Sequence, residues 1–116
     1  MGEVFNIRDY KLMNAIRSRA PHYQDGIVRV VTRNGHLSVF CYERRIFHYV
    51  VKTGFFEATT YWENHRWLRD KLNACLTGCG IMCRVYTDEF GKLRVTNRNG
   101  DDIPAYRFNS KFLEVA

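Results

Sequence analysis

The chain has 116 residues, of which 46% are hydrophobic and 26% are charged, a balance that excludes a disordered segment and is typical of a globular domain. The formal net charge of +6 favours contact with an acidic protein surface or with a nucleic acid. No apolar run is long enough to span a bilayer and no signal peptide is evident, so we expect a cytoplasmic chain without membrane contact. The length predicts a single domain over residues 1–116.

The first predicted element is a helix at about residues 7–19. The side chain of Asn6 is suited to cap its first turn. The helix is expected to end before Pro21, because the residue that precedes a proline avoids helical geometry. The helix runs through the apolar residues Ile7, Tyr10, Met13 and Ile16.

The clearest strand signal is a hairpin from Ile27 to Tyr42. Asn34-Gly35 is the favoured pair for a two-residue type I′ turn, in which both central residues have positive φ. This turn predicts Arg29 opposite Phe40 on one face of the sheet. The other face is apolar and is expected to belong to the core.

A second tight turn at Glu43-Arg44 is predicted to lead into a third strand at Ile46–Val51. Pairing Tyr42 with Arg45 would place Phe47 opposite Phe40. The same register would place Tyr49 on that face, together with the arginines of the first hairpin.

The long helix predicted at about residues 60–76 is the best-defined element of the sequence. Thr60 and Glu63 have the spacing of a capping box, and Gly78 and Gly80 supply stop signals. An apolar stripe with helical spacing is expected to pack on the sheet, and it contains Tyr61, His65, Leu68, Leu72, Cys75 and Leu76.

A last hairpin is predicted from Ile81–Thr87 and Leu93–Asn97, with Val85 opposite Val95. Ile103–Phe108 is a candidate final strand, which Pro104 restricts to an edge or a strand start. Phe112, Leu113 and Val115 are expected to dock the tail. The predicted order is therefore α-βββ-α-ββ(β), an α+β fold with a mainly antiparallel sheet of hairpins packed on the long helix.

The layout resembles a loose group of small phage and prophage proteins of uncharacterised function. The residues that carry the resemblance are Thr59-Thr60, the string Lys71-Leu72-Asn73-Ala74-Cys75-Leu76, Gly80 and the strand Arg84-Val85-Tyr86. The resemblance implies a small accessory protein and brings no known active site. The chain departs from the group by a longer helix and by Leu93-Arg94-Val95 where an aromatic-rich strand is usual.

The sharpest functional candidate is the face of the first three strands that carries arginines among aromatic rings. Such a face can stack bases and hold phosphates. The alternative is that the first helix covers this face and packs on the rings. The candidate contact residues are Arg29, Arg33, Phe40, Tyr42, Arg44, Arg45, Phe47 and Tyr49.

Two chemical alternatives involve cysteine. Cys75, Cys79 and Cys83 have C-x3-C-x3-C spacing, with Cys41 or His48 as a possible fourth zinc ligand, although structural zinc sites usually show C-x2-C or C-x4-C knuckles. A cysteine–histidine nucleophile would require a thiolate beside a base. Buried reduced thiols explain the same residues, because cysteine behaves as a small hydrophobe. We therefore expect no metal, no cofactor and no catalytic residue.

The sequence thus favours a non-enzymatic, phage-type accessory protein that binds and modulates a host protein or nucleoprotein complex, for example as an inhibitor of a defence system. Its high aromatic content, 15% of residues, suits an interface, since aromatic residues and arginine anchor most interfaces. The first alternative is a protein that binds DNA or RNA directly through the basic aromatic face. The second is a small enzyme with a cysteine–histidine site.

Overall fold

The computed structural model of this protein describes residues 6–58, 66–97 and 99–104. Its elements, in chain order, are α1 (Ile7–Arg17), β1 (His22–Asp25), β2 (Val28–Arg33), β3 (His36–Cys41), β4 (Arg44–Val50), β5 (Phe56–Ala58), α2 (Arg66–Gly78), β6 (Arg84–Thr87), β7 (Leu93–Thr96) and β8 (Asp102–Pro104).

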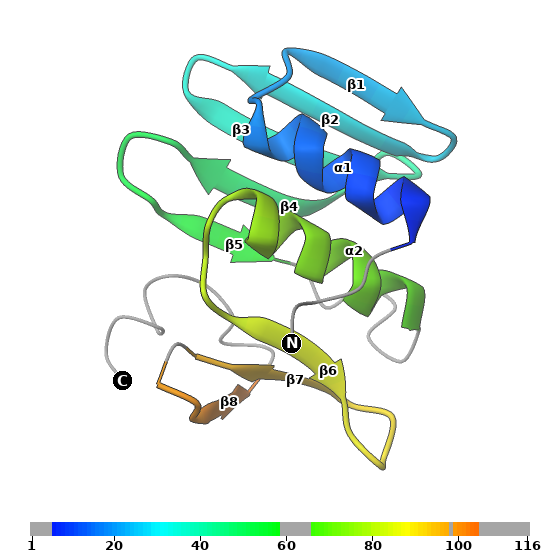
Figure 1. The fold of residues 1–116 in the computed structure, drawn as a ribbon, viewed down its shortest axis with the longest axis vertical. Helices are drawn as coiled ribbons and strands as arrows, with labels where there is room; N and C mark the ends of the chain where they lie inside the picture. Colours follow the sequence, from blue (N-terminus) through cyan, green and yellow to red (C-terminus); the bar gives the residue numbers. More distant parts are fainter. Residues whose placement is uncertain (1–5, 59–65, 98, 105–116) are drawn as a thin grey trace.

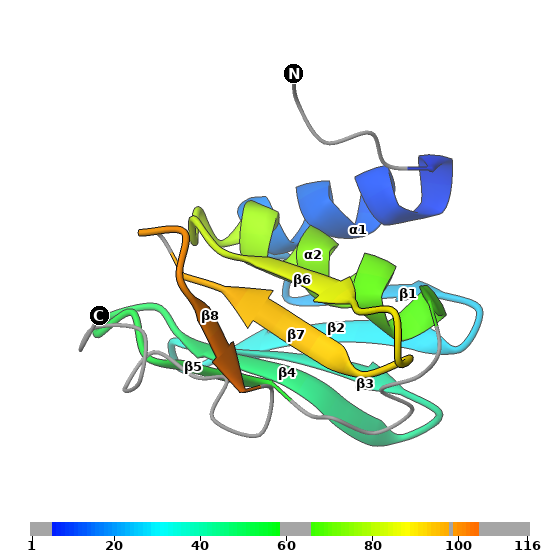
Figure 2. The same cartoon turned by 90° about the horizontal axis from the view of Figure 1, so that it is seen from below.

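The strands form two antiparallel sheets, one of five strands in the order β1-β2-β3-β4-β5 and one of three strands in the order β6-β7-β8. Both helices lie side by side on the same face of the five-stranded sheet, and the three-stranded sheet lies beside α2 on the side away from α1 (Figures 1 and 2). The predicted α+β class with mainly antiparallel strands is confirmed. Strands β1 and β5, which the sequence analysis did not predict, extend the larger sheet at both edges.

Helix α1 begins as predicted and buries only some of its apolar residues. The side chain of Asn6 accepts a hydrogen bond from the backbone N–H of Asp9 at 2.9 Å, which caps the first turn. Of its apolar residues, Met13 and Ile16 are buried, whereas Ile7 and Tyr10 are 75% and 53% exposed. The buried face of the helix consists of Asp9, Leu12, Met13, Ala15 and Ile16.

The position of α1 follows from two contacts with α2. The buried carboxylate of Asp9 forms an ion pair with the buried ammonium of Lys71. Gly78 allows the helices to approach closely, because a Cβ atom there would lie 2.8 Å from the carbonyl oxygen of Met13 and 2.9 Å from a methyl carbon of Ile16. Since unpaired buried charges are costly, the ion pair favours this packing of the two helices over others.

The β2–β3 hairpin has the predicted register. Asn34 and Gly35 have φ values of 53° and 78°, as a type I′ turn requires. Arg29 lies opposite Phe40, while the other face of the hairpin packs into the core. The residues of that core face are Val28, Val30, Leu37, Val39 and Cys41.

The β3–β4 register differs from the prediction. The turn is formed by Tyr42 and Glu43, with φ values of 49° and 65°, and a bulge between Val39 and Phe40 shifts the pairing again. Phe47 therefore pairs with Val39 and is 1% exposed in the core. The sequence pattern conceals this shift because tyrosine and glutamate are uncommon at positive φ.

Helix α2 contributes the predicted stripe, in that Leu68, Leu72, Cys75 and Leu76 are fully buried. The predicted cap at Thr60 and Glu63, and the stripe residues Tyr61 and His65, lie outside the described residues. The helix ends in a Schellman motif, in which the N–H of Ile81 donates to the carbonyl of Leu76 and Gly80, with a φ of 76°, donates to that of Thr77.

The second sheet closes the other side of α2. Val85 pairs with Val95 as predicted, and both are buried in the same core as the α2 stripe. The last described strand, β8, contains the start of the predicted final strand and pairs with β7. The rest of that strand, together with Phe112, Leu113 and Val115, lies outside the described residues.

Candidate functional site

The candidate site is the face of the five-stranded sheet opposite the helices, which we call the outer sheet face. Because side chains alternate along a strand, this face is made by the residues between those that enter the core. In the described part of the chain, no helix or strand covers it (Figure 2). Its residues are His22, Gln24, Arg29, Val31, Arg33, His36, Ser38, Phe40, Arg45, His48, Val50 and Glu57.

Arginines flank the one phenylalanine of this face among the described residues. Phe40 lies directly opposite Arg29 on one neighbouring strand and Arg45 on the other. The guanidinium carbon of Arg29 lies 4.5 Å from the centre of the Phe40 ring, and its Nη2 lies 3.1 Å from a carboxylate oxygen of Glu43. Arg29 is thus held against the ring, whereas Arg45 is exposed.

The structure brings together half of the predicted contact residues. Tyr42 and Arg44 lie at the exposed β3–β4 turn. The expected placement of Phe47 and Tyr49 on this face is wrong, because the register shift turns both toward the helices, where Tyr49 packs under Arg19. The four that share the outer sheet face are Arg29, Arg33, Phe40 and Arg45.

The suggested alternative, in which the first helix covers the outer sheet face, is also wrong. Helix α1 packs on α2 at the opposite face of the sheet (Figure 1). The exposed Ile7 and Tyr10 are therefore not involved in covering the arginines.

A hydrogen-bonded chain of His36, His48 and Glu57 crosses the same face, and sequence reasoning missed it. Nδ1 of His36 lies 2.9 Å from Nε2 of His48, and Nδ1 of His48 lies 3.4 Å from Oε2 of Glu57. Glu57 stands directly opposite His48 on the neighbouring strand. The predicted register put His48 on the core face, and the three-residue strand β5 gives no pattern that would reveal Glu57.

The two histidine rings meet edge to edge. Their planes are 8° apart, and their centroids are 5.2 Å apart. Near-parallel planes that contain nitrogens 2.9 Å apart cannot have the roughly 3.5 Å separation that face-to-face stacking requires. The centroid separation equals the nitrogen separation plus one ring radius on each side, so the two nitrogens point at each other. This is the geometry of an N–H···N hydrogen bond and leaves no room for a metal ion between the rings.

The cysteines do not form the considered zinc or nucleophile site in the described residues. Among these residues, no three histidine, cysteine or acidic side chains converge as metal ligands. Cys41 and Cys75 are buried in the core, and no disulfide joins any of the four cysteines, all of which lie in the described residues. Burial raises the pKa of Cys41, raises that of Cys75 well above its usual range and raises that of Cys79 to about 12. These three thiols therefore lack the thiolate character that a nucleophile needs.

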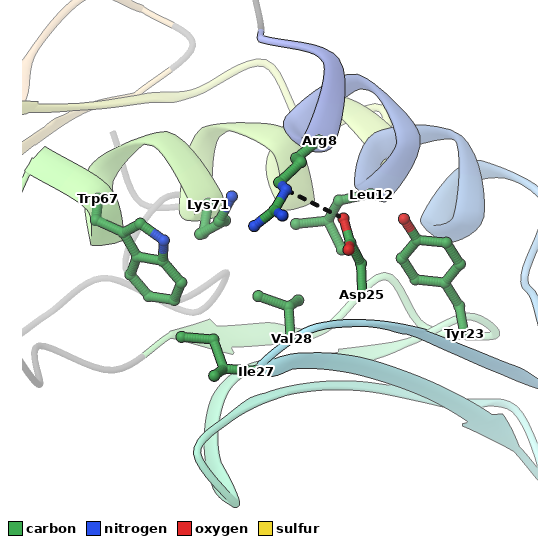
Figure 3. A pocket seen from close by; sticks show the side chains of 8 residues that line it. All are labelled: Arg8, Leu12, Tyr23, Asp25, Ile27, Val28, Trp67 and Lys71. Atoms are coloured by element: carbon green, nitrogen blue, oxygen red, sulfur yellow. Dashed lines mark ion pairs between the residues drawn. The ribbon is translucent and has the colours of Figure 1, made fainter.

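A small hollow lies between α1, α2 and the β1–β2 hairpin (Figure 3). Its volume of about 80 Å³ is below the several hundred Å³ of typical small-molecule sites. Arg8 lies across it with its Nε 3.9 Å from a carboxylate oxygen of Asp25, while Trp67 and Lys71 line the opposite wall. Lys71 pairs with Asp9 and Arg8 with Asp25, so the charged side chains that line this hollow are paired.

Comparison with protein-family models, curated proteins and solved structures finds no match to this chain. In the described part of the chain, neither helix has the length and apolar character needed to cross a membrane. The geometry of the outer sheet face is therefore the basis for any functional conclusion.

Proposed function

We propose that this chain is a non-enzymatic binding protein that uses the outer sheet face to hold the acidic surface of a partner protein. In the phage-type role that the sequence resemblance implies, the partner is a host protein or nucleoprotein complex in the cytoplasm, and binding modulates its activity. The proposal includes inhibition of a host defence system as one form of that modulation.

One observation carries the proposal: both helices pack on the same face of the five-stranded sheet. An antiparallel sheet commonly has one solvated face, whose outward residues are polar. Here arginines surround a phenylalanine, and aromatic residues and arginine are enriched at the centres of interfaces. The positive charge of Arg33 and Arg45 complements carboxylates of the partner.

The arrangement of the rings favours a protein over single-stranded nucleic acid. Sheets that bind RNA present two or three exposed rings on neighbouring strands, on which bases stack. Phe47 and Tyr49, which would complete such a platform, face the helices. The remaining ring, that of Phe40, is half-buried, and the guanidinium of Arg29 lies over it.

Direct binding to DNA or RNA is the second candidate, and the net charge of +6 supports it. Phosphate contacts do not require stacked bases, so the exposed arginines alone could bind the sugar-phosphate backbone of DNA or RNA. Such binding would weaken steeply with salt, because each neutralised phosphate releases counterions.

The test compares the wild-type protein with two charge-reversed variants in a capture experiment from bacterial lysate, with and without nuclease. Arg45→Glu reverses the charge beside Phe40 on the outer sheet face. Lys11→Glu makes the same change of charge at an exposed position of α1, on the other side of the sheet, and serves as the matched control.

Our proposal expects a protein that is captured after nuclease treatment by the wild type and by Lys11→Glu, and that is lost with Arg45→Glu. Capture that disappears with nuclease would support the nucleic-acid alternative instead. Equal capture by all three proteins would exclude the outer sheet face as the contact surface.

A further inference from the structure

We propose that the chain of Glu57, His48 and His36 is a proton-linked carboxylate contact, through which the outer sheet face takes up one proton when it binds an acidic protein segment. The inference rests on the proposed function and adds a site and a mode of regulation to it. It concerns a part of the face that is separate from the Arg29–Phe40 contact.

The direction of the hydrogen bonds fixes which nitrogen accepts the proton. Nδ1 of His48 faces the carboxylate of Glu57, and a carboxylate only accepts hydrogen bonds, so His48 carries its proton on Nδ1. While both rings are neutral, its Nε2 is an acceptor, so the facing Nδ1 of His36 donates. Nε2 of His36 remains as a bare lone pair at the exposed end of the chain, with no partner among the described residues.

Protonation at this exposed nitrogen turns the chain into a cation without breaking any hydrogen bond. The proton comes from solution and binds Nε2 of His36, while Nδ1 of His36 continues to donate to His48.

The charged side chains next to His36 are basic, so the carboxylate that pairs with protonated His36 would come from a partner. Arg33 on β2 lies directly opposite His36, and the exposed Lys52 follows β4 in the adjoining turn. On β1, His22 shares the cross-strand row of His48 but is separated from it by two strands. Glu57 is the acidic group of this part of the face among the described residues, so an incoming carboxylate would meet Arg33 and protonated His36 together.

An acidic protein segment fits this site better than a phosphate backbone. A carboxylate can accept from the Nε2–H of His36 with one oxygen and from the guanidinium of Arg33 with the other, since guanidinium and imidazolium groups both donate to carboxylate oxygens. The affinity gained from this contact depends on the proton, because Nε2 of neutral His36 has a lone pair that would repel the same carboxylate.

The test uses the full-length protein and a fluorescein-labelled hexaglutamate peptide, whose affinity is measured by anisotropy from pH 8 to pH 6 at constant ionic strength. Uptake of one proton predicts that affinity rises by up to tenfold per pH unit as the pH falls. His36→Gln and His48→Gln are expected to remove the pH dependence. His22→Gln, a change of the same kind on the same face, is expected to retain it.

A second measurement tests the hydrogen-bond chain in the free protein. Ring ¹⁵N spectra at pH 8 are expected to show both His36 and His48 protonated at Nδ1, the tautomer that free histidine disfavours in water. A predominance of the Nε2–H tautomer in His48 would overturn the chain as drawn.

The outcomes separate this inference from the proposed function. Hexaglutamate binding that requires Arg45 but has the same affinity at pH 6 and pH 8 would overturn the proton link and leave the binding function standing. Absence of hexaglutamate binding at every pH would overturn both. If His22→Gln abolished the pH dependence and His36→Gln preserved it, the proton would bind at His22 instead of His36. That result would overturn the inference.

Discussion

Asn73 on α2 pairs with the backbone of Val85 as if it were another strand. Its side-chain nitrogen donates to the carbonyl oxygen of Val85, and its side-chain oxygen accepts from the N–H of Val85, both at 2.8 Å. Strand β6 is an edge strand of the second sheet, and its outward N–H and C=O groups would otherwise be buried without partners. This one side chain therefore attaches the three-stranded sheet to the helical layer.

Replacing Asn73 with alanine is expected to lower the free energy of unfolding by about 2–4 kcal/mol, because two buried backbone groups lose their partners. Urea denaturation measures the change. Asn14→Ala, at an exposed position of α1, is the control and is expected to alter stability little. A loss below about 0.5 kcal/mol for Asn73→Ala would show that β6 does not depend on this pair.

Replacing Gly78 with alanine is expected to destabilise the protein, although helix propensity alone predicts stabilisation. Alanine is favoured over glycine inside a helix by about 1 kcal/mol. A Cβ atom at this position would nevertheless lie 2.8 Å from the carbonyl oxygen of Met13, which cannot move without displacing α1. We expect Gly78→Ala to destabilise the protein by about 1–3 kcal/mol. Thermal unfolding of Gly78→Ala and of the exposed neighbour Thr77→Ala would decide, and an increased melting temperature for Gly78→Ala would contradict the close helix contact.

The β2–β3 turn depends on Gly35, whose φ is 78°. A valine there would have to adopt a left-handed conformation, which costs roughly 1–2 kcal/mol or more for a β-branched residue. We expect Gly35→Val to lower the melting temperature measurably. Gly35→Asn is the control, since asparagine tolerates positive φ better, and an equal effect of both changes would exclude backbone strain as the cause.

Local signals account for the parts of the fold that the sequence predicted. The cap at Asn6, the Asn34-Gly35 turn and the alternation around Val85 and Val95 each act within a few residues. They specify the start of α1 and the registers of two hairpins, and hence the α+β class. The position of Arg29 opposite Phe40 on the outer sheet face followed from the same turn.

The remaining features depend on contacts that no local pattern encodes. The buried face of α1 is selected by the ion pair of Asp9 with Lys71, which are 62 positions apart. The β3–β4 register depends on positive φ at Tyr42 and Glu43. Sequence rules do not predict positive φ for tyrosine or glutamate. The histidine chain of the candidate site required both that register and the short strand β5, so it was not predictable from single residues.

The thiol of Cys79 predicts how stability changes at alkaline pH. Desolvation raises the pKa of Cys79 to about 12, against an ordinary value of 9.0, although the nearby Arg19 acts in the opposite direction. Between pH 9 and 12 the unfolded chain loses this proton while the folded chain keeps it, so stability falls as the pH rises. The contribution is up to about 1.4 kcal/mol per pH unit.

Urea unfolding of the wild type and of Cys79→Ala at pH 8, 9 and 10 measures this contribution. Other groups titrate in the same range, but they are shared by both proteins and cancel in the comparison. We expect the stability of Cys79→Ala to fall less steeply above pH 9. Parallel curves would show that the folded state does not hold the Cys79 proton.

Phe40 and Phe47 provide a matched pair that separates stability from binding. Phe47 is 1% exposed in the core, so Phe47→Ala is expected to cost about 3–5 kcal/mol. Phe40 is half-buried on the outer sheet face, where its ring contacts Arg29. Because the ring already touches solvent, Phe40→Ala is expected to cost only about 1–2 kcal/mol.

The same two variants test whether the outer sheet face binds the partner. If it does, Phe40→Ala weakens partner binding at a temperature where the protein remains folded, whereas Phe47→Ala reduces binding only in proportion to its unfolded fraction. Circular dichroism gives that fraction, and anisotropy with the captured partner gives the affinity. A Phe40→Ala protein that loses more than about 3 kcal/mol of stability would show that the ring is a core residue, as a covered face requires. A stable Phe40→Ala protein with unchanged affinity would place the partner elsewhere on the molecule.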